Sequence, residues 1–146
     1  MSSKYERELK KILEQHDFFV IRSAGSKSID LISAIPKNRK GNIVFIEEKS
    51  THDRRFYTSN NQETKDQYDM NSFLAEEYNL DIVYAIRYVS NQKSKLWKIY
   101  EPDYESSKYP VFRDNEGIAL EDWINKKLGK QEPELAYCGI GKDKGN

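Results

Sequence analysis

The sequence is poor in cysteine and has no long apolar run, and both absences narrow the class of protein. Its single cysteine, Cys138, excludes an internal disulfide and is typical of a protein from a reducing compartment. No apolar stretch approaches the roughly 20 residues of a membrane span, and the opening MSSKYEREL is not a signal peptide. We therefore expect a cytoplasmic protein with no membrane segment.

The net charge is zero, although charged residues make up 33% of the chain. Across 146 residues, 24 Lys and Arg balance 24 Asp and Glu, and aromatic residues make up 12% of the chain with ten tyrosines. This composition is typical of one soluble globular domain. Residues 1–65 nevertheless hold 13 basic against 9 acidic residues. A basic front half indicates a polyanionic partner, although solvated surface charge is the commoner explanation of this fact alone.

The hydrophobic pattern predicts an α/β domain. The predicted elements are, in chain order, a helix within 2–18, strands at 18–23, 29–35 and 43–50, a helix at 64–78, strands at 82–89 and 95–101, and a helix at 119–128. The first strand should be short and buried, the strand at 82–89 central, and the last helix should cap an edge of the sheet. This αβββαββ order favours a central mixed β-sheet flanked by helices. We expect the segment 129–146 to be a flexible tail.

The strand at 43–50, IVFIEEKS, begins with apolar residues that should be buried, but its second half carries three charged residues. Alternate residues of a strand share a face, so Glu47 and Lys49 point one way and Glu48 the other. Asp30 begins the preceding strand, and a hairpin through residues 36–42 would bring Asp30 beside Glu47. An ordinary Glu47–Lys49 ion pair and a solvated Glu48 are the simpler explanations of the same pattern.

Two carboxylates and an amine at one sheet edge suit metal-assisted phosphodiester chemistry. Oxygen ligands select a hard cation such as Mg²⁺ or Mn²⁺. The metal lowers the pKa of a bound water and draws charge from the phosphate. Lys49 is then available to orient the water or to stabilise charge that develops at phosphorus.

Two further segments fit the same chemistry, although each has an ordinary explanation. The loop RSAGSKS (22–28) precedes Asp30, and its hydroxyls and amides could reach phosphates. A plain glycine turn at Gly25 explains it equally. Glu6 fits a capping box with Ser3, and it also lies at the border of the buried stripe, where it could face the metal as an outer ligand.

The segments ERELKKILEQHDFFVIRSAGSKSIDLISA and NIVFIEEKS resemble the archaeal Holliday junction resolvases, which belong to the PD-(D/E)XK nuclease superfamily. The resemblance is close over residues 6–35 and 42–57, looser to about residue 128, and absent from the tail. It implies a restriction-endonuclease-like fold over residues 1–128. It also implies a metal-dependent, structure-selective endonuclease that resolves four-way DNA junctions by paired symmetric nicks. Ile29 stands before Asp30 where the superfamily has its first proline.

The resemblance also assigns roles to individual residues. The implied catalytic residues are Glu6, Asp30, Glu47, Lys49 and Ser26. The implied metal, Mg²⁺ with Mn²⁺ as a substitute, would be held by Asp30, Glu47 and the backbone carbonyl of Glu48, with Glu6 acting through water. The resemblance implies that Arg7, Arg22 and Tyr57 bind the junction. The excess of basic residues in the front half adds further candidates for DNA binding, namely Lys27, Arg54, Arg55 and the turn 37–40. Leu74 and Tyr78 correspond to apolar dimer contacts, although a core role for this stripe remains open.

Two other functions remain compatible with these residues. A repair or restriction-type nuclease of the same superfamily would cut flap, duplex or single-stranded DNA. A junction-binding protein without catalysis would have no use for a cluster of carboxylates beside a polyanion. The resemblance further implies a homodimer in recombination and repair, in an archaeal cell or a cell infected by an archaeal virus.

Overall fold

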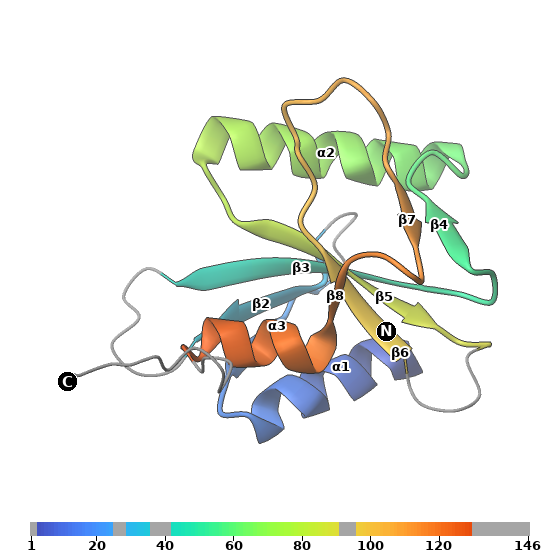
Figure 1. Ribbon diagram of the computed structural model, residues 1–146. Helices are drawn as coiled ribbons and strands as arrows, with labels where there is room; N and C mark the ends of the chain where they lie inside the picture. The colour runs from blue at the N-terminus through green and yellow to red at the C-terminus, as the bar shows by residue number, and fades with distance from the viewer. Residues whose placement is uncertain (1–2, 25–28, 36–41, 91–95, 130–146) are drawn as a thin grey trace, which may run out of the picture.

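The computed structural model describes residues 3–24, 29–35, 42–90 and 96–129, and its centre is a six-stranded sheet in the order β1-β2-β3-β5-β6-β8 (Figure 1). Its strands are β1 (Phe19–Arg22), β2 (Leu31–Ala34), β3 (Ile43–Thr51), β5 (Ile82–Tyr88), β6 (Leu96–Tyr100) and β8 (Ile118–Ala119). Only β3 and β5 are parallel, and every other neighbouring pair in this sheet is antiparallel. The predicted mixed sheet is confirmed.

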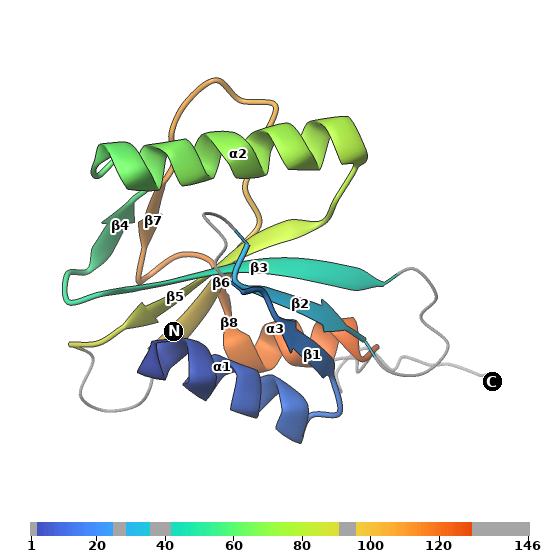
Figure 2. The same ribbon diagram turned by 180° about the vertical axis from the view of Figure 1, so that it is seen from behind.

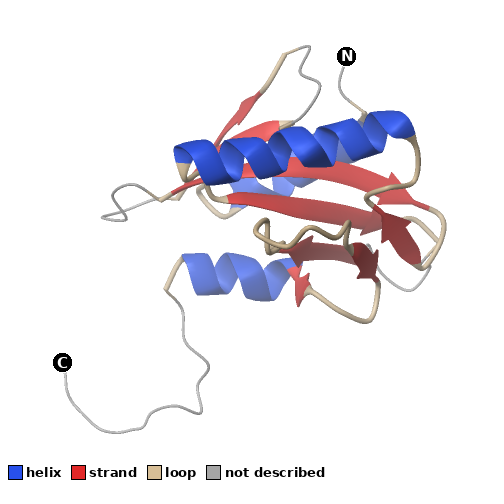
Figure 3. Ribbon diagram, turned by 90° about the horizontal axis from the view of Figure 1, so that it is seen from above, coloured by secondary structure: helices blue, strands red, loops and turns tan. Residues whose placement is uncertain are grey.

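In the described residues three helices flank the sheet, on both of its faces (Figure 1). They are α1 (Lys4–Gln15), α2 (Gln62–Tyr78) and α3 (Leu120–Lys127). Helices α1 and α3 lie on one face, and α2 lies along the central strands on the other (Figure 3). None of the described helices is long and apolar enough to cross a bilayer.

The larger core fills the space between the sheet and the helices α1 and α3. Leu9 and Leu13 of α1 and Trp123 of α3 are completely buried there, and the rings of Phe18 and Trp123 lie 6.1 Å apart. The prediction that α3 caps an edge was wrong. Since Leu120, Trp123 and Ile124 of this helix are all buried, α3 must lie across the face of the sheet instead.

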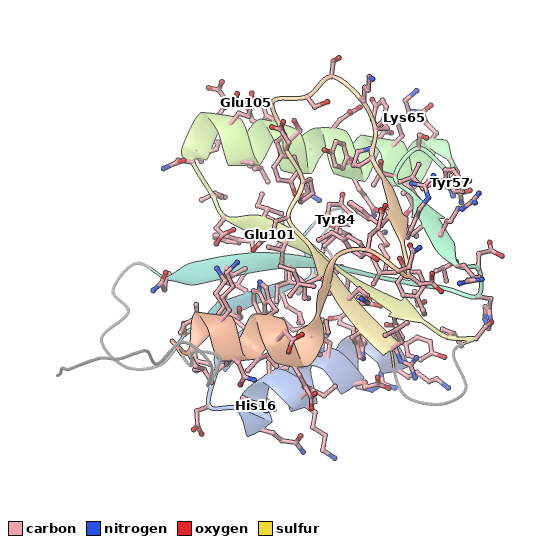
Figure 4. All side chains as sticks on the ribbon, in the orientation of Figure 1. His16, Tyr57, Lys65, Tyr84, Glu101 and Glu105 are labelled. Atoms are coloured by element: carbon pink, nitrogen blue, oxygen red, sulfur yellow. The ribbon has the colours of Figure 1, made fainter. Side chains whose placement is uncertain are left out.

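A second, tyrosine-rich core lies on the α2 side and accounts for much of the tyrosine content. A two-stranded ribbon of β4 (Arg55–Tyr57) and β7 (Val111–Arg113) closes it. Its buried members are Tyr68, Tyr84, Ile86, Tyr88, Tyr100 and Phe112. Figure 4 shows Tyr84 between α2 and the sheet. The strands β4, β7 and β8 have only two or three residues each and were not predicted.

The strand β1 differs from the prediction of a buried strand. Its residues Phe19 and Ile21 are 65% and 49% exposed, whereas Val20 between them is buried. β1 lies at an edge of the sheet, and none of the helices in the described residues covers the face of β1 that points away from α1 (Figure 2). Only the face toward α1 is therefore buried.

Candidate active site

The register of β2 and β3 brings Asp30 beside Glu47, as predicted. Leu31 pairs with Ile46, and the Asp30 amide donates to the Ile46 carbonyl at 2.9 Å, so Asp30 stands opposite Glu47. Oδ2 of Asp30 accepts a 2.7 Å hydrogen bond from the Glu48 amide. The Asp30 carboxylate is therefore held where β2 begins.

Glu47 lies beneath α2 with only 1% of its surface exposed. Its Oε1 accepts a hydrogen bond from Asn71 Nδ2 at 3.1 Å, and its Oε2 is 3.6 Å from Lys49 Nζ. The ammonium of Lys49 in turn donates to Oε1 of Gln67. The sequence analysis missed Gln67 and Asn71. Their signal is a pair of polar residues four positions apart on α2, which therefore share one helix face.

Glu6 and Glu48 lie on the α1 side of this cluster. Oγ of Ser3 accepts from the Glu6 amide at 3.0 Å, which caps α1, and donates to Glu48 Oε1 at 3.4 Å. Oε2 of Glu6 forms an ion pair with Arg22 Nε at 3.2 Å. Glu6 thus both belongs to the helix cap and faces the cluster. The expectation that Glu48 is simply solvated was wrong, because α1 packs beside it and leaves it half-buried.

Burial raises the pKa of all four carboxyl groups, and the nearby Asp30 raises the pKa values of Glu6, Glu47 and Glu48 further. Burial is the main cause for Glu47 and raises its pKa to about 8, with Asp30 adding to the shift and Lys49 opposing it. Burial, followed by Asp30 and Glu6, raises the pKa of Glu48 to about 7. The pKa values of Asp30 and Glu6 are also raised, in both cases mainly by burial. Such a cluster resists full ionisation until a cation neutralises it.

The donor atoms fit a small hard cation. Within the described residues, no three Asp, Glu, His or Cys side chains form a group that could hold one ion. A metal here would therefore depend on two carboxylates, Asp30 and Glu47, and complete its shell with the Glu48 carbonyl and water. Mg²⁺ is commonly held by one or two carboxylates and keeps several waters. Glu6, already paired with Arg22, would reach it only through water.

The predicted DNA-binding residues are exposed where the structure describes them. Arg7 lies on α1, and Arg22 lies beside Glu6. Arg54 forms a 3.2 Å ion pair with Asp114. Arg55 donates to the hydroxyl of Tyr57 at 3.4 Å, and Figure 4 shows Tyr57 on β4. The predicted Ser26, Lys27 and the turn 37–40 lie outside the described residues.

The apolar stripe of α2 faces outward. Phe73 and Tyr78 are 54% and 64% exposed, and their rings meet edge to face at 6.2 Å. The buried residues of α2 are instead Tyr68 and Asn71. Of the two predicted dimer contacts, Tyr78 is thus exposed, whereas Leu74 is half-buried.

Residues 2–131 match the family model described as archaeal Holliday junction resolvase (Hjc). The chain belongs to this family. The resemblance seen in the sequence is thereby confirmed, and the matched residues include every described position of the cluster.

Two members illustrate the likeness within the archaeal Holliday junction resolvase family. The Crossover junction endodeoxyribonuclease Hjc of Methanocaldococcus jannaschii is 49% identical over 55 residues, an alignment that covers 38% of this chain and 38% of that protein. The structure of Archaeoglobus fulgidus Hjc, a Holliday junction resolvase from an archaeal hyperthermophile, superposes with a TM-score of 0.62. That match covers 88% of this chain and 96% of the other at 17% identity, so it supports the shared fold alone.

Proposed function

We propose that this protein is a metal-dependent endodeoxyribonuclease that resolves four-way DNA junctions by paired symmetric nicks during recombination and repair. Its setting would be the cytoplasm of an archaeal cell or of a cell infected by an archaeal virus. The observation that carries the proposal is the convergence of Asp30, Glu47 and Lys49 beneath α2 in a chain of the resolvase family. Clustered carboxylates beside a polyanion are costly for a protein that only binds DNA, so catalysis accounts for them better than binding does.

In this proposal each residue of the cluster has a separate task. Asp30, Glu47 and the Glu48 carbonyl hold the Mg²⁺ ion, for which Mn²⁺ substitutes. The bound ion supplies an acidified water and positive charge beside the scissile phosphate. Lys49, held next to Glu47, orients the attacking water or stabilises charge on the phosphate oxygens. Glu6 orients outer-shell water, and Ser26 contacts the DNA backbone.

The outer face of the β4–β7 ribbon supports DNA binding next to this site. Arg55 and Arg113 are direct partners across the ribbon, and both are exposed. Like charges directly opposite each other destabilise an antiparallel pair, and among the described residues neither arginine forms an ion pair. A DNA phosphate between the two would remove this repulsion. Tyr57 lies on the same face and adds an aromatic ring for stacking.

Exposed apolar side chains support a homodimer. Six large ones lie on the β1–β3 region and α2, namely Phe19, Ile21, Ile43, Met70, Phe73 and Tyr78. The pairing Phe19–Ala34–Ile43 forms one apolar row across three strands, on the sheet face opposite α1, where α2 lies along the central strands and leaves β1 uncovered (Figure 2). Monomers seldom expose contiguous apolar patches of this kind. A second copy would cover it and place two equivalent sites on a two-fold axis, which matches the symmetry of a four-way junction.

The test is cleavage of synthetic DNA of defined shape. A four-way junction, a flap and a linear duplex of shared sequence are each incubated with the protein, with Mg²⁺ and with EDTA. We expect symmetric nicks in the junction alone, and only with Mg²⁺. Preferred cutting of flap or duplex would instead indicate a repair or restriction-type nuclease, and binding without nicks would indicate a junction-binding protein.

A further inference from the structure

Helix α2 contacts the catalytic strand through two polar side chains that match its spacing. Gln67 and Asn71 are four residues apart, which is about 6 Å along a helix. Glu47 and Lys49 are two residues apart, which is about 6.6 Å along a strand. The contacts are in register, because Gln67 meets Lys49 and Asn71 meets Glu47.

Asn71 is poorly explained by a packing role alone. It is completely buried, and its Nδ2 donates to both Glu47 Oε1 and Tyr84 Oη at 3.1 Å. Its own Oδ1 has no hydrogen-bond partner among the described residues. Burying an amide with one unsatisfied oxygen costs free energy that an apolar side chain would avoid. The amide is best explained by the carboxylate that it contacts.

Gln67 has the corresponding role toward Lys49. A lysine carries its charge on a flexible four-carbon chain with three rotatable donors, so its ammonium has no fixed place without partners. Here the ammonium lies between Glu47 Oε2 and Gln67 Oε1. Gln67 accepts from Lys49 and adds no charge, so it fixes the ammonium without neutralising it.

We propose that Gln67 and Asn71 are positioning residues of the nuclease site. Asn71 fixes the rotamer of the Glu47 carboxylate for metal binding, and Gln67 fixes the ammonium of Lys49 toward the scissile phosphate. The inference rests on the proposed function for the reaction that the site performs. Outer partners of metal ligands usually contribute about 10- to 100-fold to metal affinity or rate.

The first experiment compares two substitutions of the half-buried Gln67. Gln67→Met removes the acceptor at similar size, and Gln67→Asn keeps an uncharged amide acceptor on a side chain that is one methylene shorter. We expect Gln67→Met to lower the single-turnover nicking rate at saturating Mg²⁺ by about 10- to 100-fold. The junction Kd and the Mn²⁺ Kd should stay within about twofold, and Gln67→Asn should recover part of the rate. Equal losses in both variants, or no loss in Gln67→Met, would overturn the role of Gln67.

The second experiment measures Mn²⁺ binding to the DNA-free protein by calorimetry, so it does not depend on cleavage. Asn71→Leu should weaken Mn²⁺ binding by about 10- to 100-fold, whereas Glu76→Gln, an exposed change on the same helix, should leave it unchanged. Unchanged Mn²⁺ affinity in a folded Asn71→Leu variant would overturn the role of Asn71. If Asn71→Leu does not fold, Asn71→Ala decides, because it removes the donor and adds neither bulk nor charge.

The two experiments separate this inference from the proposed function. A native protein that binds Mn²⁺ but nicks no junction would contradict the proposed function, while the Mn²⁺ titration of the Asn71 variants would still decide whether α2 positions Glu47. Full junction cleavage together with unaltered behaviour of the Gln67 and Asn71 variants would contradict the inference alone.

Discussion

Asp30 and Glu47 stand opposite each other across the β2–β3 pair, and the proximity of Asp30 adds to the raised pKa of Glu47. Two such groups cannot both ionise readily in a buried place. The stability of the metal-free protein therefore depends on pH. A bound cation would allow both groups to be ionised at the same time.

The stability of the metal-free protein should fall as pH rises. The pKa of Glu47 is raised from 4.5 to about 8 in the folded state, so the folded protein binds more protons than the unfolded chain within this window. The stabilisation is present below pH 4.5 and is lost as pH rises through about 8. Glu47→Gln should flatten the dependence, as measured by thermal unfolding in EDTA from pH 5 to 9. A native protein that gains stability relative to Glu47→Gln over this range would contradict the burial of the carboxyl pair.

Asp30→Asn and Glu47→Gln should each abolish nicking and leave junction binding intact. Loss of a metal ligand removes several kcal/mol of transition-state stabilisation, which corresponds to roughly a thousandfold or more in rate. Removal of a negative charge near phosphates should keep or tighten the junction Kd in gel-shift titrations. Native nicking rates in either variant would show that the metal site is assigned to the wrong residues.

Glu6→Gln separates the cap of α1 from the site. A glutamine still completes a capping box, so a purely structural Glu6 predicts an active, stable variant. Because Glu6 also pairs with Arg22 and raises the pKa of Glu48, we expect slower nicking with an unchanged unfolding midpoint. Ser3→Ala is the converse control, and it should cost about 1 kcal/mol of stability through the lost cap.

The ribbon residues should contribute to DNA affinity through phosphate contacts. Arg113→Gln and Arg55→Gln should each weaken junction binding and reduce the slope of log Kd against log salt by about one. Lys126→Gln, an equal change of charge at an exposed position of α3, is the matched control and should leave the slope unaltered. A native slope in both ribbon variants would place the DNA elsewhere.

Phe73→Asp should produce monomers whose sites are intact but no longer paired. Phe73 is exposed, so the change leaves the fold in place, whereas Leu74→Asp also puts a charge at a half-buried position. Sedimentation would report the loss of the dimer, and junction assays would show single, unpaired nicks. A Phe73→Asp protein that remains dimeric would move the contact away from this face of α2.

Local sequence patterns were sufficient to predict that Asp30 and Glu47 lie side by side. Strand alternation separates Glu47 from Glu48, and a short hairpin returns the chain so that Asp30 meets Glu47. Both are properties of neighbouring segments. The cap with Ser3 and a position facing the cluster were foreseen as two alternatives for Glu6, and the structure combines them, whereas its ion pair with Arg22 was not predicted.

The remaining parts depend on packing between distant segments. The rotation of α2 about its axis turns Asn71 toward the core and Phe73 toward the outside. The apolar residues of this helix alone would favour burial of the opposite face, the one that carries Phe73. Glu48 is half-buried only because α1 lies beside β3. Arg113 meets Arg55 across a ribbon whose strands are separated by the whole of α2, β5 and β6, so no local signal connects them.

The most direct test of the account uses a supercoiled plasmid that extrudes a cruciform, which is a four-way junction. Paired nicks by one dimer convert the plasmid straight to a linear product, whereas independent nicks release the supercoil, reabsorb the cruciform and leave nicked circles. With Mg²⁺ we expect linear product from the native protein, nicked circles from Phe73→Asp and no cleavage from Glu47→Gln. Nicked circles alone from the native protein, or cutting that is equal on a plasmid without the cruciform, would contradict junction resolution by a two-site dimer.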